Sequence, residues 1–218
     1  MRAFLALMAF LTLTVPAWAE PTLAGRFVAA AEQGEVSGIA GLLDQSVRDS
    51  ARVDWSDLFV AASYAAQAGR AGDAHFLYHA AQMRSRAEMN AFPPTTASEV
   101  AELRAALKQQ VGAMVNPMMV SHAEDFIAAV GRLQRWQPVF AKGFQPDWPV
   151  AGPSTSPESA YAEVRQEHLS ILEDLAWYLR DPVYLDALRA RQAGNLAAEQ
   201  VMRDIEKRDG RAGFMGTD

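Results

Sequence analysis

Apolar residues recur along this chain at intervals of three or four positions, which is the spacing of one buried face of an α-helix. The members of the three clearest stripes are Val100, Leu103, Leu107, Val111 and Met114, then Phe126, Val130 and Leu133, then Tyr161, Val164, His168, Ile171, Leu175 and Tyr178. Strand-like patterns at 118–120 and 139–140 are too short to build a sheet. Because each stripe must be covered by another helix, the pattern predicts an all-α fold.

Proline, glycine and capping residues place the ends of these helices. Ser156 before Pro157 and Asp181 before Pro182 each supply a cap ahead of a first-turn proline. We expect helices at residues 23–33, 36–48, 55–68, 71–88, 98–115, 122–136, 157–180, 182–193 and 196–208. They are predicted to form one domain over 20–208, made of hairpins at 20–90, a helical hairpin at 98–136 and C-terminal helices at 157–208, followed by a flexible, Gly-rich tail at 209–218.

A proline-rich segment interrupts the helical pattern at residues 137–156. Irregular segments of this length are unusual in compact domains, and many of them are functional or disordered. This one carries the aromatic residues Phe140, Phe144 and Trp148, which we expect to plug the core. Alternatively the loop is a lid or a partner surface, in which case Trp148 is its best contact residue.

The first residues have the form of a secretory signal peptide. Met1 and Arg2 precede an apolar run at 3–13, and a small-x-small cleavage site ends at Ala19. The run is too short to cross a hydrocarbon core of about 30 Å as a helix. We therefore expect cleavage after Ala19, and the absence of cysteine at the cut excludes a lipoprotein anchor. The alternative is an ordinary buried helix at the start of a cytosolic domain.

Composition narrows the function classes. The chain contains no cysteine, which excludes thiol chemistry, disulfides and Cys-ligated zinc. Its net charge of −6 comes without a basic cluster, which is a poor match for nucleic acid or anionic lipid. No second apolar stretch has spanning length, so we expect no stable membrane insertion after signal cleavage. The bacterial periplasm is the expected location, with full secretion as the alternative.

Residues 58–81 carry a pattern of small and aromatic positions around a turn glycine. Its members are Leu58, Ala61, Ala62 and Ala65, then Gly69, then Ala74, Tyr78 and Ala81. This segment resembles one helical hairpin of the tetratricopeptide-repeat (TPR) family. It departs from the motif at Ala62 and Ala65, which replace a glycine and an aromatic, and at Arg86, which replaces the closing proline.

If the resemblance to the TPR family holds, a degenerate repeat unit precedes this hairpin. Gly34 lies before Gly69 by about the family's repeat length of roughly 34 residues. The resemblance implies a concave helical surface that binds a peptide or protein, formed by TPR-like hairpins packed on a C-terminal helical bundle. One unit cannot bury its own face, so the later helices would have to cover it.

Two histidines in this hairpin are candidates for chemistry. His75 and His79 are four residues apart and project from one helix face, as paired zinc ligands do. The zinc-protease signature requires Glu after the first histidine, but Phe76 stands there and no third ligand is apparent. We therefore expect a partly exposed polar face rather than a metal site.

His168 lies within an apolar stripe, where a hydrogen-bonded core histidine is the expected reading and a catalytic or pH-sensing role the alternative. The acidic residues around it, Glu163, Glu167, Glu173 and Asp174, would allow acid–base hydrolysis of a glycan. Acidic helix residues more commonly form a solvated face. Nucleophile-elbow, phosphate-loop and dinucleotide motifs are missing from the sequence, which disfavours an enzyme and predicts no cofactor.

The leading functional hypothesis is an exported periplasmic adaptor that binds another protein or a peptide. We expect its surface contacts to include Tyr64, Gln67, His75, His79 and Trp148. One alternative is an immunity-type inhibitor of a toxin delivered into the periplasm. Another is a cell-wall hydrolase that uses His168 and a carboxylate.

Overall fold

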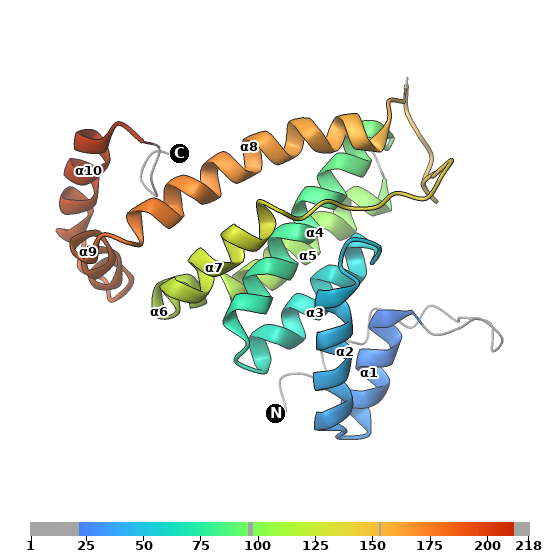
Figure 1. The fold of residues 1–218 in the computed structure, drawn as a ribbon, viewed down its shortest axis with the longest axis horizontal. Coiled ribbons are helices and arrows are strands. Elements are labelled where there is room, and N and C mark those ends of the chain that lie inside the picture. The colour runs from blue at the N-terminus through green and yellow to red at the C-terminus, as the bar shows by residue number, and fades with distance from the viewer. Residues whose placement is uncertain (1–21, 96–97, 153, 212–218) are drawn as a thin grey trace.

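A computed structural model of the chain describes residues 22–95, 98–152 and 154–211. Within these ranges the regular secondary structure is α-helical, apart from an isolated bridge between Pro94 and Val150 (Figure 1). The all-α prediction is confirmed, whereas the expected signal peptide at 1–19 lies outside the described residues. The helices are α1 (Leu23–Glu32), α2 (Val36–Arg48), α3 (Trp55–Gln67), α4 (Ala71–Ala91), α5 (Glu99–Val115), α6 (Met118–Ser121), α7 (Ala123–Leu133), α8 (Pro157–Tyr178), α9 (Pro182–Gln192) and α10 (Ala198–Asp209).

Two antiparallel hairpins, α1–α2 and α3–α4, follow one another at the N-terminal end (Figure 1). Their turns contain Gly34 at φ 68° and Gly69 at φ 71°, a left-handed conformation that glycine adopts without steric cost. Small side chains let the backbones of α3 and α4 approach closely, since Ala61, Ala65 and Ala74 are fully buried. The close approach explains why the hairpin forms at this alanine-rich stretch.

Helix α4 is the centre of the molecule and contacts α3, α5, α7 and α8. It is therefore buried on nearly all sides, including polar positions such as Arg84 and Glu88. The Arg84 Nε donates to Glu88 Oε1 at 2.8 Å and its Nη1 donates to the Ala51 carbonyl at 3.0 Å. These bonds satisfy charged groups that would otherwise be costly to bury.

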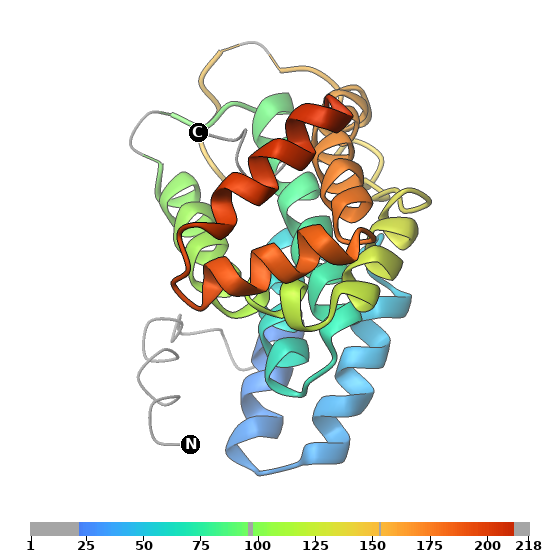
Figure 2. The same ribbon diagram turned by 90° about the vertical axis from the view of Figure 1, so that its left-hand side faces the viewer.

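Helix α8 crosses α4 and α7, and the α9–α10 pair lies at its far end (Figures 1 and 2). The predicted caps are confirmed, because Ser156 Oγ accepts from the Ser159 N–H and Asp181 accepts from the Val183 N–H. Tyr178 at the end of α8 stacks on Tyr184 of α9 at 4.7 Å between ring centroids. No helix in the described part of the chain is both long enough and apolar enough to cross a membrane.

The segment at 137–156 packs on the C-terminal end of α4. The Phe144 ring lies 5.8 Å from that of Phe92, and the Arg84 guanidinium lies 5.2 Å from the centre of the Phe140 ring. The Trp148 indole N–H donates to the Phe92 carbonyl at 3.0 Å. The aromatic side chains thus cover the end of the central helix, as expected of a plug.

Several details differ from the sequence prediction. Residues 118–120, which resembled a strand fragment, lie in the short helix α6, because Met119 and Val120 are buried beside the start of α7. Arg211, in the segment predicted to be a flexible tail, pairs with Asp174 at 3.1 Å and stacks on the Trp177 ring. The remaining tail residues, 212–218, lie outside the described ranges.

A glycine sets the distance between α5 and α4. A Cβ atom on Gly112 would lie 2.5 Å from Tyr78 Oη, which is far inside van der Waals contact. Gly112→Ala is therefore expected to lower the free energy of unfolding by about 1–3 kcal/mol. Gly131→Ala in α7, where the added Cβ meets nothing within 4 Å, is expected to raise it by about 0.5–1 kcal/mol. Urea denaturation of both variants tests this contrast, and equal effects would contradict the close approach.

Candidate functional site

A groove between α4, α5 and α8 encloses about 610 Å³. This volume lies within the range of sites that hold small molecules or a few residues of a peptide. Its lining consists of Tyr78, His79, Gln82 and Arg86 from α4, Arg104 and Lys108 from α5, Asn116 after α5, and His168, Ile171, Leu172 and Leu175 from α8. We call this the α4–α5–α8 groove.

Helical spacing brings these side chains together. Arg104 and Lys108 are one turn apart and project from the same side of α5. On α8, Ile171 and Leu175 are likewise one turn apart and form an apolar wall. The Tyr78 hydroxyl donates to the Lys108 carbonyl at 3.1 Å, which ties α5 to α4 at the groove.

The groove has a positive charge balance. Its lining contains Arg86, Arg104 and Lys108, and no carboxylate is among the described residues that line it. Arg86 pairs at 2.5 Å with Glu167, which is largely exposed beside the groove. The Arg104 Nε donates to Ser85 Oγ at 2.9 Å, and no described carboxylate lies within ion-pair distance of Arg104 or Lys108. Two cations therefore face the groove without a counter-ion in the described part of the chain.

A pair of histidines forms part of the groove's lining. His79 Nδ1 lies 3.2 Å from His168 Nε2 and 3.4 Å from the Gln82 amide nitrogen. In the shorter contact, one of the two ring nitrogens donates and the other accepts, and a neutral imidazole nitrogen accepts only one hydrogen bond. The two rings therefore form a polar, uncharged surface at neutral pH.

Burial and neighbouring cations keep these rings neutral. The pKa of His168 is lowered from 6.5 to about 4, first by burial and then by the nearby charges of Arg86 and Lys108, while Glu167 opposes the shift. Burial lowers the pKa of His79 well below its ordinary value, and His168 and His75 add to the shift. The pKa of Arg104 is also lowered, first by burial and then by repulsion from Arg86. Each shift reflects a site in which further positive charge is unfavourable.

The apolar wall is partly open to solvent. Ile171 remains 43% exposed, although its position in the α8 stripe predicted burial. Leu172 beside it is buried and Leu175 is partly buried against the core. The C-terminal half of α8 therefore presents apolar surface to the groove instead of to another helix.

Of the predicted contact residues, only His79 lines this groove. Tyr64 is buried and stacks on Phe27 at 4.7 Å, and His75 is also buried, so neither offers the expected surface. These expectations were wrong because α3 and α4 are covered on several sides by α1, α5, α7 and α8.

The other two predicted contacts lie away from the groove. Gln67 is exposed, and its amide nitrogen donates to the Ser63 carbonyl of its own helix at 3.0 Å. Trp148 is half-buried against the end of α4. Gln67 lies one helical turn after Tyr64 on α3, but neither Gln67 nor Trp148 lines the groove with His79.

The expectation of a partly exposed polar face at His75 and His79 was also wrong. The two rings stack at 6.4 Å between centroids in the interior, and His75 also meets Phe126 edge-on at 5.1 Å. Neither ring nitrogen of His75 has a hydrogen-bond partner among the described residues. His168 does form the predicted hydrogen bond, and it also lines the groove.

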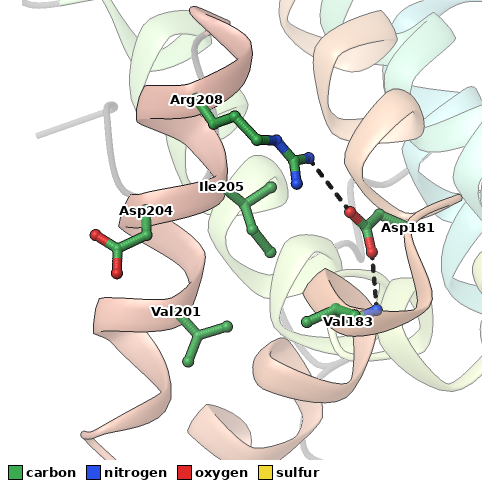
Figure 3. Close-up of a pocket in the computed structure, with 6 residues that line it drawn as sticks. All are labelled: Asp181, Val183, Val201, Asp204, Ile205 and Arg208. Carbon is green, nitrogen blue, oxygen red and sulfur yellow. Dashed lines mark hydrogen bonds and ion pairs between the residues drawn. The ribbon is translucent and has the colours of Figure 1, made fainter.

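A second hollow lies between α9 and α10 and encloses about 330 Å³ (Figure 3). Its lining includes Val183 and Val201, with Arg208 reaching toward Asp181 at 3.6 Å. Arg208 also pairs with Asp209 at 2.6 Å. Because its cation is already neutralised, this hollow offers fewer unpaired groups to a ligand than the α4–α5–α8 groove.

Sequence reasoning missed Arg86, Arg104 and Lys108 as site residues. In the sequence, Arg86 is distinguished only as a departure from the TPR motif. Arg104 and Lys108 have the pattern of residues on an ordinary solvent-exposed helix face. A usable signal was the weak amphipathicity of 71–91, since a helix with apolar residues on all its sides must be covered by several other helices. Recognising α4 as the central helix would have directed attention to its neighbours.

In the described ranges, no three histidine, aspartate or glutamate side chains are grouped so that they could hold a metal ion. Comparison of the chain with protein-family models, with curated proteins and with solved structures finds no match.

Proposed function

We propose that this protein is an exported helical adaptor that binds a segment of another protein in the α4–α5–α8 groove. The observation that carries the proposal is the groove's lining, where Arg104 and Lys108, which have no counter-ion among the described residues, face an apolar wall. Binding sites usually combine apolar surface, which the ligand covers, with a few polar groups that fix the ligand's orientation. Among the described residues, the lining contains no carboxylate to act with His168, so it lends no support to the hydrolase alternative.

Two sequence features support the adaptor role. The α3–α4 hairpin carries the small-residue pattern that resembles the TPR family, whose members present helical surfaces to peptides. The first residues resemble a secretory signal, so the expected partner is a periplasmic protein. The proposal shifts the binding surface from the hairpin itself to the groove that the hairpin forms with α5 and α8.

Site-specific photo-crosslinking in cells tests this proposal. A photoreactive phenylalanine analogue would replace Ile171, which is exposed in the groove, or Val36, which is 79% exposed on α2. We expect a discrete crosslinked partner from position 171 only, recovered from the periplasmic fraction with a chain that begins at Glu20. Crosslinks from position 36 alone, or a chain retained in the cytoplasm with its first nineteen residues, would contradict the proposal.

A further inference from the structure

Resting on the proposed function, we infer that the α4–α5–α8 groove recognises a peptide carboxylate adjacent to an apolar side chain. The carboxylate would lie between Arg104 and Lys108, and the apolar side chain would lie on the wall formed by Ile171 and Leu175. The carboxylate is either an Asp or Glu side chain or the chain terminus.

The charges of the groove favour an anionic ligand. The chain as a whole has a net charge of −6, yet the described lining of this groove has cations and no carboxylate. Arg104 is half-buried and is repelled by Arg86, so an added anion would relieve a repulsion that already exists. A guanidinium binds a carboxylate through two parallel hydrogen bonds, and an ammonium adds a point charge.

The neutral polar groups favour a peptide over a fatty acid. His79, Gln82 and Asn116 line the same groove and can pair with the N–H and C=O groups of a bound backbone. An acyl chain covering these polar groups would remove them from water and offer them no hydrogen bond in return, which is unfavourable. The apolar wall extends over about one helical turn from Ile171 to Leu175, which suits a side chain such as leucine better than a long tail.

The test uses matched synthetic peptides as probes. The first is acetyl-Gly-Leu-Glu-Leu-Gly-amide, and its counterparts carry Gln or Lys in place of Glu. A fourth peptide, acetyl-Gly-Leu-Gln-Leu, ends in a free carboxylate, and decanoate represents a fatty acid. Binding is followed by NMR of the four histidine imidazoles, of which His79 and His168 line the groove and His122 does not.

We expect the Glu peptide or the free-acid peptide to shift the His79 and His168 signals and to leave His122 unchanged. The protein should bind the peptide with the carboxylate about 10–100-fold more tightly than the Gln amide peptide. This is the difference in affinity expected from one hydrogen bond to a charged group. Lys108→Glu should remove the preference, whereas Lys142→Glu, with the same charge change on the exposed 137–156 loop, should retain it. Unchanged His75 and His122 signals in Lys108→Glu show that this variant is folded.

Other outcomes separate the two proposals. Equal affinity for the Glu and Gln peptides, or tighter binding of the Lys peptide, overturns the carboxylate inference but leaves a peptide-binding groove. Binding of decanoate with no peptide response at about 1 mM overturns both, because the ligand is then an acyl chain. No response of His79 or His168 to any probe also overturns both proposals for this groove.

Discussion

Replacing Arg84 with methionine is expected to lower the free energy of unfolding by about 3–5 kcal/mol at pH 8. Arg84 and Glu88 are both buried, and the substitution would leave the Glu88 carboxylate without its partner at 2.8 Å. It would also remove the donor to the Ala51 carbonyl and the guanidinium that lies over the Phe140 ring. Breaking a buried ion pair from one side costs far more than losing an exposed one.

The size of this loss should depend on pH. Burial outweighs the attraction of Arg84 and raises the pKa of Glu88 from 4.5 to about 7. A carboxyl with a raised folded pKa binds more protons when folded, so its contribution to stability falls as pH rises from about 4.5 to 7. At pH 5 Glu88 is neutral in the folded protein, and Arg84→Met should then cost clearly less than at pH 8.

Guanidinium denaturation of Arg84→Met at the two pH values measures this difference. Arg48, which is exposed and 3.7 Å from Asp49, provides the control, since Arg48→Met should change the free energy of unfolding by less than about 0.5 kcal/mol. An equal, small loss for Arg84→Met at both pH values would mean that the pair is not buried under the 137–156 loop as described.

The second large effect is a loss of stability in acid. The histidines at 75 and 168 have pKa values lowered from 6.5 to about 4, chiefly by burial, so they are neutral in the folded protein. The unfolded chain binds their protons more readily between these pH values. Their contribution to stability is therefore complete above about pH 6.5 and is lost as pH falls toward 4, on the order of 3 kcal/mol for each histidine.

His75→Phe separates this effect from packing. Phenylalanine would keep the edge-on contact with Phe126 and would remove two ring nitrogens that have no described partner. We expect the free energy of unfolding to rise by about 1–3 kcal/mol at pH 7 and to fall less steeply between pH 6.5 and 4. Urea titrations at four pH values measure both quantities.

His122→Gln serves as the matched control, because His122 is exposed at the start of α7. At pH 7 its free energy of unfolding should lie within about 0.5 kcal/mol of the wild type. A destabilised His75→Phe with unchanged pH dependence would indicate that the imidazole at 75 is hydrogen-bonded and titrates normally in solution.

The helices were predictable because their signals are local. Ser156 and Asp181 cap α8 and α9 at the residues where the sequence placed them, and Gly69 turns the α3–α4 hairpin. The end of α4 was less predictable, since it continues to Ala91 beyond the expected residue 88. Tertiary contacts with α8 and the 137–156 loop stabilise that extra turn, and such contacts cannot be predicted from local helix propensity.

The candidate site was less predictable, because it depends on which helices meet. Arg104, Lys108 and Ile171 are far apart in the sequence, and each resembles a common surface residue in its own helix. Only the packing of α5 and α8 on either side of α4 brings them to one groove. Conversely, His75 was predicted to be exposed because its polarity suggested a surface, whereas α4 is enclosed on several sides.

Mapping the captured partner onto the protein by NMR tests the central claim most directly. If the α4–α5–α8 groove is the binding site, the segment identified by crosslinking should shift the signals of Arg86, Lys108 and Ile171 most strongly. Shifts confined to Val183 and Val201, which line the hollow between α9 and α10, with the groove signals unchanged, would contradict the account (Figure 3).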